Sequence, residues 1–300
     1  MTLTLTQIAN RLTGALDLYA VLRAVGQDVP IAEVIASLAV GSGAAKVTAD
    51  RLASVDKGLL QAVLRKGAGL QPIQAEAAIR AHLALVTPAP MFQPAIGSVP
   101  TLALLTEGQH PDMPAFSDRA LDAWFASRGV LYGLGSYGER RRVYETPQFA
   151  DAASPERRSV HLGVDVFARA GTPVYAPLPG RVLHVTYNPD PLDYGNTLIV
   201  QHDAGGVPFY TLCGHLAGSL PHLLKIGDAV APGQLIAHLG DWHENGGWAP
   251  HLHFQIMTDT LDQTGGNFPG VGHPSLLDVW TAILIDPNLI LRLPEDRFQA

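Results

Sequence analysis

The chain has 300 residues, of which 47% are hydrophobic and 16% charged, so it can bury a sizeable core and is not mainly disordered. Its one cysteine, Cys213, excludes an internal disulfide scaffold. The 20 Lys and Arg residues against 27 Asp and Glu give a net charge of -7, which argues against a nucleic-acid partner.

The sequence has no run of the roughly eighteen uncharged apolar residues that a membrane span needs. Its first apolar segment, Leu12 to Val25, is interrupted by Asp17 and Arg23 and makes a poor signal peptide. We therefore expect a cytoplasmic protein without a membrane span, with non-classical export left open.

Residues 1–86 have the pattern of helices, because apolar residues recur at three- and four-residue steps. The repeats are Ile8 to Leu22, Ile31 to Leu38, Leu52 to Val63 and Ile73 to Leu85. This region holds 8 basic and 6 acidic residues, whereas the remainder holds 12 and 21, and such a shift indicates separate units. We predict a helical bundle that docks on the rest of the chain, mediates dimerisation or covers a groove.

Residues 87–100 are predicted to be a linker, because four prolines there disfavour both a helix and a central strand. Residues 101–159 form a connecting segment with one short helix, Ser117 to Arg128, before a glycine-rich turn region. The same segment carries the basic run Arg140 to Arg142, which either meets an anionic group of a substrate or lies in a solvated loop.

Residues 160–300 have the pattern of short strands bounded by Gly, Pro, Asp or Asn. Brief strands at close intervals predict an antiparallel β sandwich or barrel. The predicted fold class is therefore α+β, with an N-terminal helical bundle followed by a mainly antiparallel β domain.

Two short motifs in this domain have the spacing of a metal site. His251 and His253 project from one face of a strand, roughly 7 Å apart. A straight strand would hold His161 and Asp165 roughly 13 Å apart, so the backbone must bend, and Gly163 permits a bend. Either motif alone is more often a pair of half-exposed side chains. Together, two imidazoles and one carboxylate leave an open position, which is typical of catalytic zinc.

The segment from about Val160 to Ile256 resembles the lysostaphin-type, or LytM-like, zinc endopeptidases. The resemblance is carried by HLGVDVFARAGTPVYAPLPGRV, YGNTLIVQHDAGG, YTLCGHLAGSL, IGDAVAPGQLIAHLG and PHLHFQI. It implies the fold called the duplicated hybrid motif, with Zn2+ as the cofactor. It also implies five site residues, with His161, Asp165 and His253 as zinc ligands and with His215 and His251 as the catalytic pair.

The sequence departs from that family's pattern beside the site. Trp248-Ala249-Pro250 stands where small residues are common, after a longer loop that begins at Glu244. Two further loops, around Tyr137 and Tyr194, carry side chains that can line a groove. We therefore predict four substrate-binding residues, which are Tyr137, Tyr194, Asn196 and Trp248.

The residues and the resemblance together predict a zinc metallopeptidase or amidohydrolase, in which water activated by the metal attacks an amide carbonyl. Two substrate classes stay open, a peptidoglycan-type peptide and a small intracellular amide. The alternative prediction is a non-catalytic, metal-containing module that binds a peptide or a glycan. We expect no nucleic-acid partner and no membrane span, and the sequence leaves the oligomeric state open.

Overall fold

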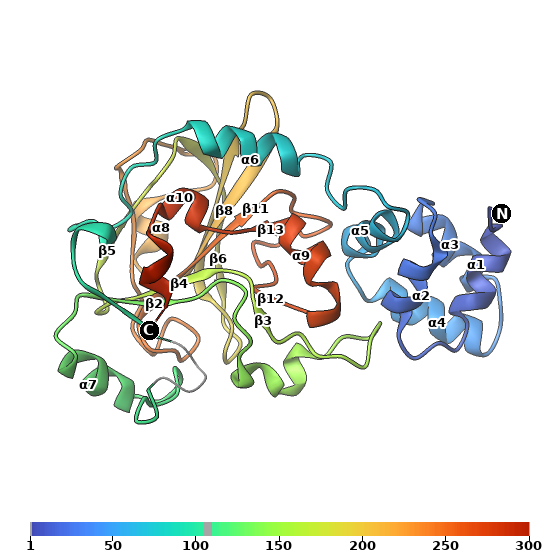
Figure 1. The fold of residues 1–300 in the computed structure, drawn as a ribbon, viewed down its shortest axis with the longest axis horizontal. Helices are drawn as coiled ribbons and strands as arrows, with labels where there is room; N and C mark the ends of the chain where they lie inside the picture. Colours follow the sequence, from blue (N-terminus) through green and yellow to red (C-terminus); the bar gives the residue numbers. More distant parts are fainter. Residues whose placement is uncertain (1, 105–109, 300) are drawn as a thin grey trace.

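The structure of the protein is a computed structural model that describes residues 2–104 and 110–299. It is a mixed α+β protein in which N-terminal helices precede a mostly antiparallel sheet, and this confirms the coarse fold prediction. Helices α1 to α5, drawn in blue in Figure 1, project from one end, and the sheet fills the other. Within the described ranges, no helix is long and apolar enough to cross a membrane.

The five N-terminal helices form a helical unit whose hydrophobic core continues into the β domain, because buried residues such as Leu162, Ile199 and Trp280 belong to the same cluster. They are α1 (Leu5–Leu12), α2 (Leu18–Val25), α3 (Ile31–Ala39), α4 (Ala44–Ala53) and α5 (Lys57–Gly67). The apolar repeat from Ile8 to Leu22 does not form one helix. Gly14 adopts a φ of 74° after α1, and Asp17 then caps α2 by accepting a hydrogen bond from the Ala20 amide.

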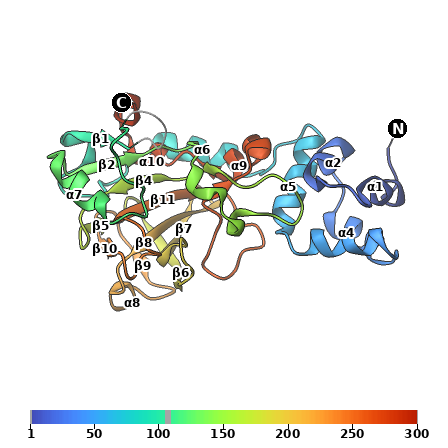
Figure 2. The same ribbon diagram turned by 90° about the horizontal axis from the view of Figure 1, so that it is seen from below.

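Helix α6 (Glu76–Leu85) lies apart from the helical unit and runs along the sheet (Figures 1 and 2). Its Ile79 and Leu83 are fully buried in the same core as the sheet. The proline-rich segment after it also packs there, because Phe92 and Ile96 are buried and the Met91 carbonyl accepts a hydrogen bond from Tyr175. Helix α6 therefore packs in one of the two large hydrophobic clusters of the sheet, whereas α1 to α5 share the other, and the predicted boundaries at residues 86 and 100 stay predictions.

The main sheet has the strand order β1-β2-β4-β11-β8-β7-β6-β9, and β13 pairs with β11 beyond the end of β4. All of these pairings are antiparallel except β1 with β2. The strands are β1 (Thr101–Ala103), β2 (Tyr132–Gly135), β4 (Val164–Phe167), β6 (Gly180–Asn188), β7 (Gly195–Asp203), β8 (Pro208–Leu216), β9 (Ala229–Val230), β11 (His251–Met257) and β13 (Leu284–Ile285). The segment predicted to connect the two domains thus supplies two strands of this sheet.

Two smaller sheets flank it. One pairs β3 (Val160–His161) with β12 (Val271–Gly272), and the other pairs β5 (Pro173–Tyr175) with β10 (Leu235–His238). The remaining helices are short, and α7 begins three residues later than predicted. They are η1 (Ile96–Ser98), α7 (Ala120–Ser127), η2 (Arg142–Glu145), η3 (Pro147–Phe149), α8 (Leu220–Leu223), η4 (Pro274–Leu276), α9 (Leu277–Ile283), α10 (Asn288–Leu291) and η5 (Glu295–Phe298).

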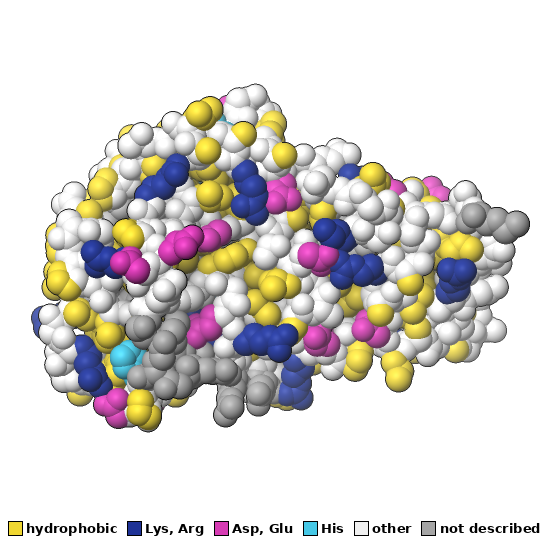
Figure 3. Space-filling model, viewed as in Figure 1, with side chains coloured by type: hydrophobic (Ala, Val, Ile, Leu, Met, Phe, Trp, Pro, Cys, Tyr) yellow, Lys and Arg dark blue, Asp and Glu magenta, His cyan; other side chains and the backbone are white. Residues whose placement is uncertain are grey.

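Polar contacts join the helical unit to the rest of the chain. Asp278 of α9 forms ion pairs with Arg23 and Lys66 of the helical unit. The Tyr19 hydroxyl donates to Asp151 at 2.7 Å, and Arg51 donates to the carbonyl of Ala152 at 2.7 Å. On the face drawn in Figure 3, basic and acidic side chains lie next to one another among hydrophobic ones, so the charge of that face is mixed.

Candidate metal and active site

The site is built on β11, which lies in the middle of the main sheet. Leu252 and Phe254 on one face of this strand are fully buried in the core. His251 and His253 project from the opposite face, because side chains alternate along a strand. The pairing of β11 with β4 sets His253 directly opposite Asp165.

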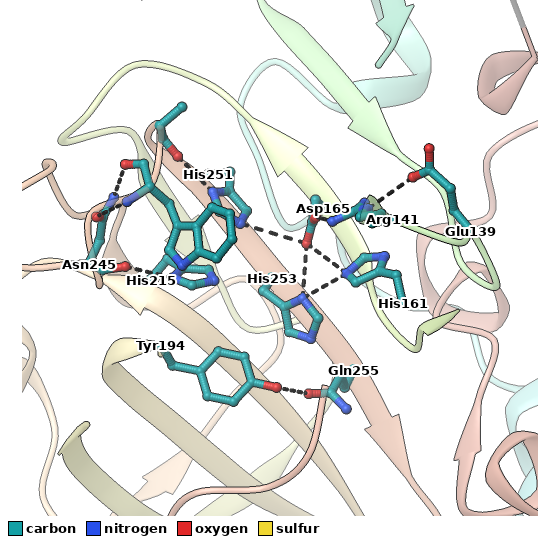
Figure 4. A network of polar contacts seen from close by, with 12 residues as sticks. Glu139, Arg141, His161, Asp165, Tyr194, His215, Asn245, His251, His253 and Gln255 are labelled. Atoms are coloured by element: carbon teal, nitrogen blue, oxygen red, sulfur yellow. Dashed lines mark hydrogen bonds and ion pairs between the residues drawn. The ribbon is translucent and has the colours of Figure 1, made fainter. Parts of the chain in front are cut away.

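His161 reaches the same place because the chain bends between β3 and β4, as the motif spacing predicted. Its Nε2 lies 3.0 Å from Nδ1 of His253 and 3.2 Å from Oδ1 of Asp165 (Figure 4). Position 163 requires glycine because there is no room for a side chain. A Cβ added there would lie 2.5 Å from Cε1 of His253, whereas the φ of Gly163 is not positive.

The three nearest polar atoms of His161, Asp165 and His253 form a compact triangle. Nδ1 of His253 lies 2.9 Å from Oδ1 of Asp165, which completes sides of 3.0 and 3.2 Å. Ligands held tetrahedrally at 2.0 to 2.1 Å from zinc would be about 3.3 Å apart. The spacing therefore fits three ligands of one ion, and each of the three side chains is buried.

The tautomer of His161 also fits a bound cation in this triangle. Its Nδ1 lies 2.9 Å from the carbonyl of Ser136, so Nδ1 carries the proton and Nε2 presents a lone pair to the Asp165 carboxylate. Burial lowers the pKa of His161, which disfavours a second proton. Burial would raise the pKa of Asp165, but neighbouring groups, among them the charged Arg141 guanidinium, lower it well below its usual value. Two acceptors that face each other fit a bound metal ion.

Arg141 holds the second oxygen of Asp165. Its Nη1 lies 2.6 Å from Oδ2 of Asp165, and its Nε lies 3.0 Å from Glu139. The side chains of Arg141 and Asp165 are only 3% and 1% exposed, so Arg141 does not lie in a solvated loop. Nothing in the basic run of the sequence distinguishes Arg141 from its two neighbours.

The predicted catalytic pair, His215 and His251, lies beside this cluster with ring centroids 4.2 Å apart. Nδ1 of His251 donates to the carbonyl of Ala249 at 2.7 Å, and Nδ1 of His215 donates to the carbonyl of Asn245 at 2.8 Å. Each ring therefore has a lone pair on Nε2, and that of His251 lies 3.8 Å from Asp165. Burial lowers the pKa of His251 to about 4 and that of His215 well below its usual value, so both rings are neutral proton acceptors.

A β-bulge directs His215 to the site. The register of β7 and β8 shifts between Cys213 and Leu216, and His215 adopts a φ of 62°. A positive φ is strained for a residue with a side chain, and such strain collects at functional sites. The bulge places His215 beside the other histidines, whereas Cys213 stays in the core, where burial raises its pKa to about 12.

These groups lie in the wall of a cavity of about 620 Å³, called the catalytic cavity below. Asp165, His215, His251 and His253 line it. Aromatic side chains from separate segments form much of the rest of the wall, which are Phe116, Tyr144, Phe149, Trp248 and Phe268. A cavity that combines an aromatic wall with convergent polar groups is a usual form of a binding site.

Of the four predicted substrate-binding residues, the structure brings two to this cavity. Tyr194 and Trp248 line it, and the Tyr194 hydroxyl donates to Gln255 at 2.9 Å. Tyr137 and Asn196 are not among the lining residues. The Tyr137 hydroxyl donates to the carbonyl of Leu284, and the Asn196 amide donates to the carbonyl of Glu244, so both side chains serve the packing of neighbouring segments.

Phe116 is a cavity residue that sequence reasoning missed. Its ring lies 4.7 Å from Phe167, which in turn stacks on His251 at 4.6 Å and 18°. The carbonyl of Phe116 accepts a hydrogen bond from Ala249, next to the same histidine. Phe116, Phe167 and His251 are far apart in the sequence, so no local pattern could predict that their rings stack.

Comparisons with known proteins agree with this geometry. Residues 159–264 match the profile of Peptidase family M23. A 114-residue stretch is 33% identical to the glycyl-glycine endopeptidase ALE-1 of Staphylococcus capitis, and it covers 36% of this chain and 28% of that protein. A 115-residue stretch is 31% identical to lysostaphin of Staphylococcus staphylolyticus, and it covers 37% of this chain and 21% of that protein.

Among solved structures, a zinc-containing peptidase from Vibrio cholerae is 34% identical over 33% of this chain and 28% of that chain, with a TM-score of 0.28. The chain thus spans about a quarter of the length of the curated relatives it matches. The five predicted site residues all lie within the matched range. Residues 159–264 therefore form a domain of peptidase family M23, the zinc-dependent family of lysostaphin and ALE-1.

Proposed function

We propose that the protein is a zinc-dependent hydrolase that cleaves amide bonds of peptides. The observation that carries this proposal is the triangle of His161, Asp165 and His253 beside two imidazoles with free Nε2 atoms, in the wall of one cavity. The motifs quoted for the resemblance also lead us to assign the β domain to the duplicated hybrid motif.

The metal would be held by Nε2 of His161, Oδ1 of Asp165 and Nδ1 of His253. A zinc ion at such a site lowers the pKa of a bound water toward about 7 and polarises a carbonyl oxygen. The protein fixes these ligands through their outer partners. Ser136 orients His161 through its carbonyl, and Arg141 engages Oδ2 of Asp165 so that Oδ1 faces the triangle.

His215 and His251 supply the proton transfers. Their Nδ1 protons are committed to backbone carbonyls, so Nε2 of each ring accepts a proton from the attacking water and returns one to the leaving amine. Burial keeps both rings neutral before the reaction, as a base requires. Phe167, stacked on His251, holds that ring in place.

We further propose that the substrate is a peptide of the peptidoglycan type, with a small amide as the second class. One relative is named a glycyl-glycine endopeptidase, and this name favours peptides with small residues around the scissile bond. Tyr194 and Trp248 would contact the substrate, since both line the catalytic cavity. Burial raises the pKa of Tyr194 well above its usual value, so its hydroxyl stays protonated and keeps its hydrogen bond to Gln255, with its oxygen left to accept one from a ligand.

The test combines metal analysis with an amine-release assay. The panel contains glycyl peptides, peptidoglycan, peptides of D-amino acids and small amides, each with and without a chelator. We expect stoichiometric zinc and chelator-sensitive hydrolysis of at least one peptide. His253→Ala should lose both zinc and turnover, His251→Gln only turnover, and His222→Gln, an exposed control, neither.

Undiminished hydrolysis by the metal-stripped protein would refute the proposal. Stoichiometric zinc without turnover on any member of the panel would instead support the alternative, a non-catalytic module that binds a peptide or a glycan.

A further inference from the structure

A second arginine, Arg158, lines the catalytic cavity and has no part in the chemistry above. Its Nη2 donates to the carbonyl of Gln148 at 3.2 Å, and its guanidinium lies 5.9 Å from the ring centroid of Phe149. In the part of the chain that the structure describes, no carboxylate forms an ion pair with Arg158. The guanidinium has five N–H donors, so most of them are free for a ligand.

The other charged groups of the cavity are already engaged or lie at its exposed rim. Arg141 is neutralised by Asp165 and Glu139. Asp193 accepts hydrogen bonds from the Asn267 amide at 2.9 Å and from the Tyr194 backbone at 2.7 Å. Asp190 is exposed. Arg141 thus has carboxylate partners, whereas Arg158, the other arginine of the cavity wall, forms no ion pair with a carboxylate among the described residues.

The surroundings of Arg158 favour an added negative charge. Burial lowers the pKa of Arg158, and the charges of Asp151 and Asp193 partly offset that effect without forming an ion pair with it. A half-buried guanidinium without an ion pair loses hydration that only an anion replaces fully. Arginine binds carboxylates through two parallel hydrogen bonds, and the Arg158 guanidinium lies over the ring of Phe149.

Arg158 also stands where the catalytic cavity meets a second one. A neighbouring cavity of about 220 Å³ shares Arg158, Gln263 and Pro269 with it. The far wall of this second cavity comes from the helical unit, through Asp56 and Leu59. A ligand that extends from the metal ligands past Arg158 therefore has room to continue toward α5.

We propose that Arg158 binds a carboxylate of the substrate, so that the protein prefers peptides with a free carboxylate close to the scissile bond. The inference rests on the proposed function, because it places the reacting amide at the cluster of His161, Asp165 and His253. It narrows the substrate class from peptides in general to anionic peptides.

The test compares two peptides that differ in one charge, N-acetyl-trialanine as the free acid and as its amide. Their binding to the zinc-loaded full chain is followed by tryptophan fluorescence, since Trp248 lies in the cavity wall. We expect the acid to bind about tenfold more tightly than the amide. Arg158→Gln should remove this preference by weakening the acid about tenfold. Arg157→Gln, the same change at the exposed neighbour, should keep it.

Unchanged amide binding and zinc content show that the Arg158→Gln variant is folded. Equal binding of acid and amide by the unsubstituted protein, a preference that survives Arg158→Gln, or no binding of the acid at millimolar concentration would each overturn the inference. The proposed function fails on a different result, which is the absence of chelator-sensitive hydrolysis across the whole panel, whatever the preference in binding.

Discussion

At the scale of single residues, the site depends on side chains whose partners are backbone carbonyls or buried charges. His161, His215 and His251 each use Nδ1 for a carbonyl, which leaves Nε2 of each ring for the site. The motif spacing predicted that His161, Asp165 and His253 share one metal site, whereas His215 was predicted only from the resemblance to a known family. It could not predict Arg141, because a run of three arginines has no feature that tells a buried side chain from an exposed one.

Replacing Arg141 with Met should weaken zinc binding. The change leaves the second oxygen of Asp165 buried without its partner, and loss of an outer partner of a metal ligand typically costs about tenfold to a hundredfold in affinity. Stability should fall by about 3 kcal/mol for the same reason. Competition with a chromogenic chelator measures the affinity, with Arg157→Met as the exposed control. Unchanged affinity in folded protein would refute the role of Arg141.

His202 should make stability depend on pH. Its Nδ1 donates to the carbonyl of Pro179 and its Nε2 accepts from Thr211, so it is held neutral, and burial lowers its pKa to about 4. The unfolded chain, with an ordinary pKa near 6.5, binds more protons between these values. His202 therefore does not reduce the free energy of unfolding above about pH 6.5. Between about pH 6.5 and pH 4, the free energy of unfolding falls by about 1.4 kcal/mol for each unit by which the pH falls.

Denaturant unfolding at pH 7.5 and pH 5.5 measures this dependence in the unsubstituted protein and in His202→Gln. We expect the variant to lose about 1.4 kcal/mol less than the unsubstituted protein over this range. Equal losses in the two proteins would show that His202 is not the group responsible.

At the scale of elements, local signals predicted the helices and strands better than their junctions. Both the repeat from Ile8 to Leu22 and that from Leu52 to Val63 divide between two helices, because turns at Gly14 and before Asp56 interrupt them. β1 and β2 belong to the main sheet because β1 pairs with β2 and β2 pairs with β4. These pairings join residues far apart in the chain, so short-range sequence patterns could not predict them. The bulge at His215 is likewise set by the pairing of β7 with β8.

The bend between β3 and β4 should not tolerate a side chain at position 163. In Gly163→Ala the new Cβ would lie 2.5 Å from His253, and the displaced ring should lose zinc at a stability cost of about 2 kcal/mol. Gly265→Ala is the matched control, because its added Cβ has open space. Zinc content after gel filtration compares the two, and full zinc retention in Gly163→Ala would contradict the packing argument.

At the scale of the whole molecule, the helical unit helps to shape the catalytic cavity. Asp56 caps α5 and also accepts hydrogen bonds from the Asp262 amide at 3.2 Å and from the Gln263 side chain at 2.6 Å. Gln263 belongs to the loop between β11 and β12, whose Phe268, Pro269 and Gly270 line the cavity. The composition shift predicted separate units, but no sequence pattern could reveal this long-range contact.

Asp56→Ala should therefore lower stability by about 1 kcal/mol and raise KM, while zinc content stays unchanged. Asp17→Ala is the matched control, because it removes the cap of α2 and touches no loop of the cavity. Steady-state kinetics on the best peptide of the panel separate the two variants. A KM that rises equally in both would mean that Asp56 acts only through the stability of its helix.

The central claim is that three side chains distant in sequence hold one metal ion beside two free imidazoles. Anomalous diffraction at the zinc absorption edge, from crystals of the zinc-loaded protein, tests it most directly. We predict one strong peak about 2.0 to 2.2 Å from Nε2 of His161, Oδ1 of Asp165 and Nδ1 of His253, with His215 and His251 facing it. A peak at other residues, or no peak near this triangle, would contradict the account.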